Sequence, residues 1–107
     1  MKRLELVDGA HVDAPSAGTV RDAVGNLSAR TEFVVLRETA GGFVQAAWGP
    51  SAGLPRGSFL LETKGDHVEG HVHTEVTDVD HLMAAFLMFL EEDSTWVGEF
   101  TWSQRTA

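Results

Sequence analysis

The clearest hydrophobic pattern in the chain lies between residues 67 and 77, where polar and small or apolar residues alternate. Val, Gly and Thr occupy the even positions. A period of two is typical of a β-strand with one dry face and one solvated face. The pattern therefore predicts a strand over His67–Thr77, and its polar face carries His67, Glu69, His71, His73 and Glu75.

Other apolar runs predict five further strands. Glu32–Glu38 is apolar on both faces, which is typical of a central strand covered on both sides. The turn residues Ala40, Gly41 and Gly42 make the next apolar run its hairpin partner. That partner is Phe43–Trp48. The remaining predicted strands are Met1–Val7, Ser58–Thr63 and Trp96–Trp102.

Two segments have helical periodicity. A main helix is predicted from a cap at Thr77 or Asp78 to about Glu92. Its apolar residues cover so much of its surface that it is either deeply buried against the sheet, which we expect, or offers its outer side to a partner. After a predicted loop over Gly9–Gly18, a short helix is predicted to open at Thr19, which stands at capping-box spacing from Asp22.

The element order is therefore β-α-β-β-β-β-α-β. This order predicts a single α+β domain over residues 1–107, with an antiparallel, mostly meander sheet of about six strands and two helices on one face. A parallel sheet would need more helical crossovers than the chain contains.

Composition narrows the class further. The 107 residues are 43% hydrophobic, enough for one core, and the absence of cysteine excludes disulfides, thiolate metal sites and thiol catalysis. Acidic residues near the N-terminus leave no apolar stretch of the kind that a signal peptide needs. The longest apolar run, Leu82–Leu90, is well short of the roughly 20 residues of a membrane span. We expect a cytoplasmic protein with no membrane partner.

The net charge of −8 is distributed unevenly. Residues 1–56 carry six basic and six acidic groups, whereas residues 57–107 carry two basic and ten acidic groups. Nucleic acid is excluded as a partner on this ground, because phosphate contacts need Lys and Arg. A basic protein is the natural partner, since complementary fields speed encounter. The alternative is that the charge serves solubility alone.

The histidine-rich face offers an alternative function. Imidazole and carboxylate groups of His67, His71 and His73, with Glu69 and Glu75, suit a small metal- or ligand-binding module. The other interpretation is a solvated face on which His pairs with Glu. Since no sharper ligand motif accompanies these residues, we assign no metal ligand and no cofactor.

Two features that suggest catalysis have simpler interpretations. Gly49–Gly53 reads G-x-S-x-G, but Pro55 follows closely and no helix can begin there, so we expect a loop. Glu62, inside an apolar strand, must be solvated, paired or used. With no assembled nucleophile, acid and base, we expect a structural or partner-binding carboxylate and not an enzyme.

Several segments together resemble a family of bacterial immunity proteins, the first-numbered immunity family of polymorphic and contact-dependent toxin systems. The resemblance covers roughly residues 30–104 and leaves the N-terminal third unmatched. It rests on order and spacing in Phe43–Ala47, Phe59–Glu62, the His-rich strand, Phe86 and Phe89 of the main helix, Trp96 and Trp102.

The resemblance implies an α+β fold and a non-enzymatic inhibitor that blocks the active site of a cognate toxin, often a nuclease or a nucleic-acid deaminase. It matches Glu62, Trp96 and Trp102 to the characteristic Glu and Trp residues of the family. With the acidic charge, it leads us to expect a monomer or homodimer whose partner-binding residues are Glu62, Glu69, Glu75, Asp78, Asp80, Trp96 and Trp102.

Overall fold

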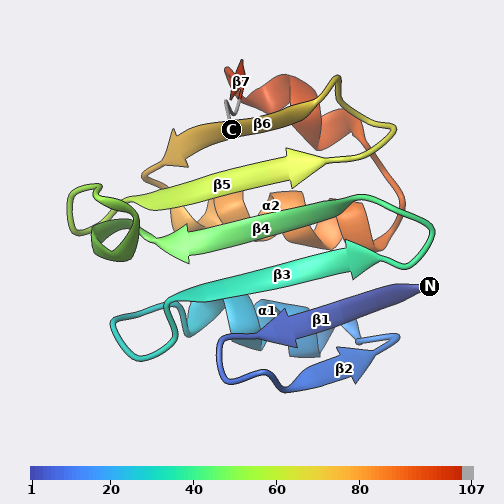
Figure 1. The fold of residues 1–107 in the computed structure, drawn as a ribbon, viewed down its shortest axis with the longest axis horizontal. Coiled ribbons are helices and arrows are strands. Elements are labelled where there is room, and N and C mark those ends of the chain that lie inside the picture. Colours follow the sequence, from blue (N-terminus) through green and yellow to red (C-terminus); the bar gives the residue numbers. More distant parts are fainter. Residues whose placement is uncertain (105–107) are drawn as a thin grey trace.

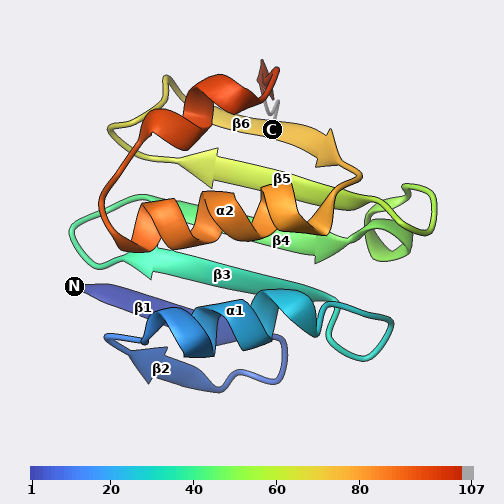
Figure 2. The same cartoon turned by 180° about the vertical axis from the view of Figure 1, so that it is seen from behind.

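Seven antiparallel strands form one sheet in the computed structural model, which describes residues 1–104. Their spatial order is β2-β1-β3-β4-β5-β6-β7, and two helices cover one face of the sheet (Figures 1 and 2). The strands are β1 (Lys2–Leu6), β2 (His11–Asp13), β3 (Phe33–Glu38), β4 (Phe43–Trp48), β5 (Phe59–Lys64), β6 (His71–Val76) and β7 (Ser103–Gln104). The helices are α1 (Ala17–Gly25) and α2 (Val79–Leu90), with 3-10 helices η1 (Gly49–Ala52) and η2 (Thr95–Glu99).

The strand register explains why one face takes both helices. Leu4, Leu36 and Val44 lie side by side in one row across the sheet, and all three are buried. Figure 2 shows α1 and α2 lying over this face. The buried residues of α2 are Leu82, Ala85, Phe86 and Phe89. The predicted fold class is confirmed, and the main helix packs against the sheet through these four residues, whereas Val79 of its predicted apolar stripe is exposed.

Strand β2 lies inside the segment predicted as a loop. Its three residues are all exposed. Because neither face of the strand is buried, its sequence shows no alternation of apolar and polar residues. It pairs with β1 through the backbone, and an ion pair of 2.7 Å joins Arg3 to Asp13 across the hairpin. Short edge strands of this kind have no hydrophobic signature, and the sequence did not predict this one.

The start of α1 also differs from the prediction. Ser16 is the N-cap, and its hydroxyl accepts the backbone N–H of Thr19 at 3.1 Å. The predicted capping box of Thr19 and Asp22 is therefore wrong, because Thr19 already lies inside the first turn.

The predicted final strand over Trp96–Trp102 is wrong. Residues 95–99 form η2, and only Ser103 and Gln104 pair with β6. The spacing from Trp96 to Phe100 suits one turn of helix as well as a strand. In the structure these two rings and that of Trp102 pack together, with centroids 5.5–6.4 Å apart.

Among the described residues, 1–104, no helix has the length and apolar character needed to cross a bilayer.

Candidate functional site

The face of the sheet turned away from the helices, here called the open face, is the candidate functional site. No helix or strand lies over it in Figure 1. The register places one row of residues across its middle, running from Glu5 through Val35, Gln45 and Glu62 to His73. The flanking rows are Arg3, Arg37, Phe43, Lys64 and His71 on one side, and Phe33, Ala47, Leu60 and Glu75 on the other.

Glu62 lies buried at the centre of this face. Only 6% of the residue is exposed, and its Oε2 lies 2.8 Å from Nε2 of His71 on the neighbouring strand. A buried carboxylate needs such a partner, because its desolvation would otherwise be costly. The sequence left three options for Glu62, namely solvated, paired or used, and the structure shows that it is paired.

Contacts continue from this pair across the sheet. The His71 and Phe43 rings pack edge to face, with centroids 5.4 Å apart. The Arg37 guanidinium lies 5.6 Å from the Phe43 ring centroid. Arg37 in turn donates to Glu5 at 3.1 Å. The open face is therefore an ordered surface of charged and aromatic groups, tied together over five strands.

The predicted acidic residues divide into three groups. Glu75, Asp78 and Asp80 are exposed at the end of β6 that leads into α2. Glu75 accepts the Ser58 hydroxyl at 2.8 Å, and Asp78 caps α2 by accepting the N–H of Asp80 at 2.9 Å. Glu69 precedes the opposite end of β6, and Glu62 lies between on β5. The structure thus brings three of the five acids together.

The two predicted tryptophans are not equally accessible. Trp96 is 2% exposed and belongs to the core, so its ring has almost no surface to offer a partner. Trp102 is half-buried and packs on Trp96, and its indole N–H donates to the carbonyl oxygen of Val97 at 2.9 Å. Of the two, only Trp102 has an appreciable exposed surface.

Of the three histidines predicted to share a strand face, His71 and His73 do so on β6, and His67 does not. Strand β6 begins at His71, because residues 65–70 form a turn in which Gly70 has a φ of +76°. His67 instead packs on the helix side, against Phe89 and Trp96, with centroids 5.5 and 5.7 Å apart. Within residues 1–104, no three His, Asp or Glu side chains are placed to hold a metal ion. The combined site of His67, His71 and His73 is contradicted by this geometry.

The hydrogen bonds of Thr63 place a proton on Nε2 of His67. The Thr63 hydroxyl donates its one proton to the carbonyl oxygen of Phe43 at 2.7 Å, so it accepts from Nε2–H of His67 at 2.6 Å. Burial lowers the pKa of the His67 imidazole below its usual value, and the nearby Asp66 carboxylate opposes this shift. His67 is therefore neutral at pH 7, with the proton on Nε2.

This burial gives a testable pH dependence of stability. The pKa of His67 is lower in the folded chain than its value of about 6.5 in the unfolded chain. Protons therefore favour the unfolded state, and stability is lost as the pH falls from about 6.5 through the folded-state pKa. We expect His67→Gln to lose less stability than the wild type between pH 7 and pH 5, measured by urea unfolding. His81→Gln, at an exposed position, should keep the wild-type dependence; equal losses in all three proteins would contradict this account.

The G-x-S-x-G segment forms no nucleophile turn between a strand and an α-helix. Residues 49–52 form η1, and the next regular element is β5. The prediction of a loop was close, since a single 3-10 turn occupies its first part.

Sequence reasoning missed how Phe43, Gln45 and Arg37 join the open face. Each lies on a strand that was predicted, but only the register shows that they flank Glu62 and His71. A period-two pattern assigns a residue to a face and does not say which residue of the next strand lies beside it.

No protein-family model matches the chain, and neither a curated protein nor a solved structure matches it. The fold and the open face define the class of protein as far as structure carries it: a two-layer α+β domain with one sheet face covered by helices and the other uncovered.

Proposed function

We propose that this chain is a non-enzymatic protein-binding module, and that it acts as an immunity protein for a bacterial toxin. It binds a basic toxin domain and occludes its active site. The observation that carries the proposal is the group of exposed carboxylates Glu75, Asp78 and Asp80 where β6 leads into α2.

The distribution of ion pairs supports a basic partner. Three of the six basic residues in the N-terminal half have acidic partners: Lys2 pairs with Glu38, Arg3 with Asp13 and Arg37 with Glu5. Among residues 1–104, the three carboxylates at the end of β6 form no ion pair with this chain, and neither does Glu69. Their field is therefore uncompensated, and it attracts a positively charged surface.

The composition of the open face supports a protein as that partner. Half-buried Phe33, Phe43 and Leu60 alternate there with polar groups, and the acids lie toward one end. Protein interfaces combine an aromatic and aliphatic centre with a charged rim in this way. A toxin that acts on nucleic acid needs a basic cleft, which an acidic surface can occupy.

The experiment begins with capture. The immobilised chain is incubated at low salt with a lysate of the source organism, and retained proteins are identified by mass spectrometry. Each retained basic protein is then expressed in bacterial cells, alone and together with this chain. The proposal predicts one protein that stops growth alone and is tolerated in the presence of the chain. A retained protein that is harmless alone, or that still stops growth beside a bound excess of the chain, would contradict the immunity function.

A further inference from the structure

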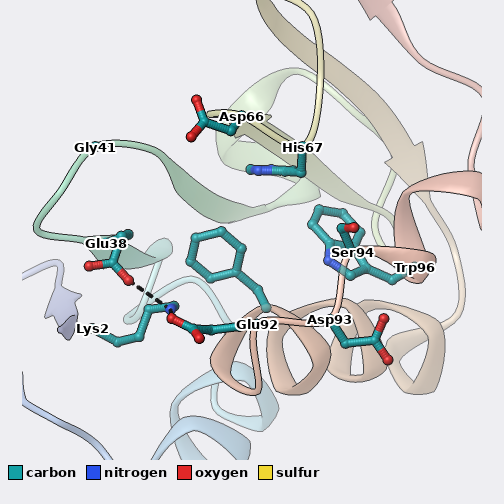
Figure 3. A pocket seen from close by; sticks show the side chains of 10 residues that line it. Lys2, Glu38, Gly41, Asp66, His67, Glu92, Asp93, Ser94 and Trp96 are labelled. Atoms are coloured by element: carbon teal, nitrogen blue, oxygen red, sulfur yellow. Dashed lines mark hydrogen bonds and ion pairs between the residues drawn. The ribbon is translucent and has the colours of Figure 1, made fainter.

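A cavity of about 280 Å³ lies away from the acids at the end of β6. It opens where the β3–β4 turn, the β5–β6 turn and the segment after α2 meet, as Figure 3 shows. No part of the proposed acidic surface described above lines it. Its chemistry has two components, an aromatic wall and a ring of carboxylates.

The aromatic wall is made by Phe89, Trp96 and His67. The His67 ring lies 5.5 Å from that of Phe89 and 5.7 Å from that of Trp96. Because His67 donates from Nε2 to Thr63 and is neutral at pH 7, this wall carries no charge. Neutral aromatic faces attract cations through their quadrupole.

Four carboxylates also line the cavity, those of Glu38, Asp66, Glu92 and Asp93. Hydrogen bonds from Lys2 and from the N-terminal amine lower the pKa of Glu38 to about 2, so it is ionised. Hydrogen bonds from Thr95 lower the pKa of Asp93. Against these acids the lining has a single cation, Lys2.

Lys2 shows how a cation fits this chemistry. Its Nζ lies 2.8 Å from Glu38 Oε2, 3.4 Å from Glu92 Oε1 and 5.3 Å from the Phe89 ring centroid. The cavity thus already holds one ammonium group between carboxylates and an aromatic face (Figure 3). The carboxylates of Asp66 and Asp93 form no ion pair within residues 1–104, which leaves charge for a second cation.

The indole N–H of Trp96 provides an independent sign of a ligand. Trp96 is only 2% exposed, yet its indole N–H makes no hydrogen bond within residues 1–104. Among the described residues, every fully buried side-chain nitrogen or oxygen has a hydrogen-bond partner. The indole nitrogen of Trp96 has none, so it must be accessible to solvent. Figure 3 shows it on the cavity side of the ring. It can donate to a carbonyl oxygen inside the cavity.

We propose that this cavity binds an arginine side chain presented by a basic protein segment. The planar guanidinium stacks on the aromatic wall and donates to the carboxylates of Asp66 and Glu92, and a backbone carbonyl of the same segment accepts from Trp96. Arginine fits better than lysine because its flat, weakly hydrated cation both stacks and forms forked hydrogen bonds. That the segment belongs to a toxin rests on the proposed function; the binding of arginine does not.

The test uses free ligand and needs no toxin. The ¹⁵N-labelled chain is titrated with N-acetyl-arginine-N-methylamide, and the indole N–H signal of Trp96 is followed by NMR. That signal is assigned by comparison with Trp48→Phe and Trp102→Phe, which each remove one of the other two. We expect a saturable shift with a Kd on the order of 1 mM, typical for so small a ligand. The neutral citrulline analogue has nearly the same shape and should cause no saturable shift.

Matched variants locate the effect. Asp66→Asn with Glu92→Gln removes two exposed carboxylates of the lining and should weaken arginine binding by at least about fivefold. Asp22→Asn with Glu32→Gln makes the same change of charge at exposed positions outside the lining and should leave the Kd unchanged. Glu38 and Asp93 are kept, because their hydrogen bonds hold the N-terminus and the start of η2.

Three results would overturn the proposal: no saturable shift, an equal shift with citrulline, or equal weakening by both variants. Equal binding of the lysine analogue would overturn the preference for guanidinium. If arginine fails to bind while the chain still captures and neutralises a toxin, the cavity proposal fails alone. If arginine binds but no toxin is neutralised, the proposed function fails and the cavity remains a site for a basic segment.

Discussion

Replacing Trp96 by alanine is expected to lower the free energy of unfolding by about 3–5 kcal/mol, the cost typical of removing a large aromatic side chain from a core. Trp96 is 2% exposed and is the largest fully buried side chain of the described residues. Its ring contacts Phe100, Trp102 and His67, so the truncation leaves a cavity that η2 alone cannot fill. Urea unfolding followed by circular dichroism measures the change.

The matched control is Trp102→Ala. Trp102 is only half-buried, so we expect its removal to cost clearly less than that of Trp96, although it loses the hydrogen bond to Val97. The resemblance to immunity proteins made Trp96 a partner-binding residue. If Trp96→Ala kept wild-type stability and lost only partner binding, the assignment of Trp96 to the core would be refuted.

Gly49→Ala is expected to cost about 3 kcal/mol, the upper part of the range for atoms forced into a packed site. A Cβ at Gly49 would lie 2.3 Å from the carbonyl oxygen of Ser58 and 2.7 Å from that of Pro55. Both are backbone atoms, and the Gly49 N–H donates to the same Ser58 oxygen at 2.8 Å, so the chain cannot yield without losing this bond. Calorimetry of thermal unfolding measures this loss of stability relative to the wild type.

Gly98→Ala is the control for Gly49→Ala. A Cβ at Gly98 would meet no atom within 4 Å, so stability should change by no more than about 0.5 kcal/mol. Comparable destabilisation by both substitutions would show that close packing at Gly49 is not the cause. The first glycine of the G-x-S-x-G segment would then need another explanation.

Much of the fold followed from the sequence because its strands carry strong local signals. Phe43–Trp48 was predicted at its observed bounds, since an apolar run follows a glycine turn. Strand β2 was missed because its three residues are exposed and held by backbone pairing alone. The predicted strand from residue 67 began too early, because the left-handed conformation at Gly70 interrupts the pairing and cannot be read from alternation.

The candidate site was predictable in part. The sequence left Glu62 solvated, paired or used, and its contact with His71 could not be predicted because it depends on strand register. The acids Glu75, Asp78 and Asp80 lie together because they are close in the chain. Glu69 does not join them, since the length of β6 separates it from the others.

The cavity and its aromatic wall could not be predicted. They depend on η2 carrying Trp96 back over α2 and on His67 turning to the helix side. Both placements depend on contacts between segments far apart in the sequence.

The affinity of the captured partner for charge-reversed protein tests the central claim most directly. Glu75→Lys with Asp80→Lys reverses two exposed charges where β6 leads into α2, and Asp78 is kept because it caps α2. Asp22→Lys with Glu32→Lys makes the same change elsewhere, also at exposed positions. Isothermal titration at low salt should show a Kd at least about tenfold higher for the first variant than for the second, with the difference shrinking as salt rises. A partner that binds both variants as tightly as the wild type would contradict an acidic binding surface at this end of the sheet.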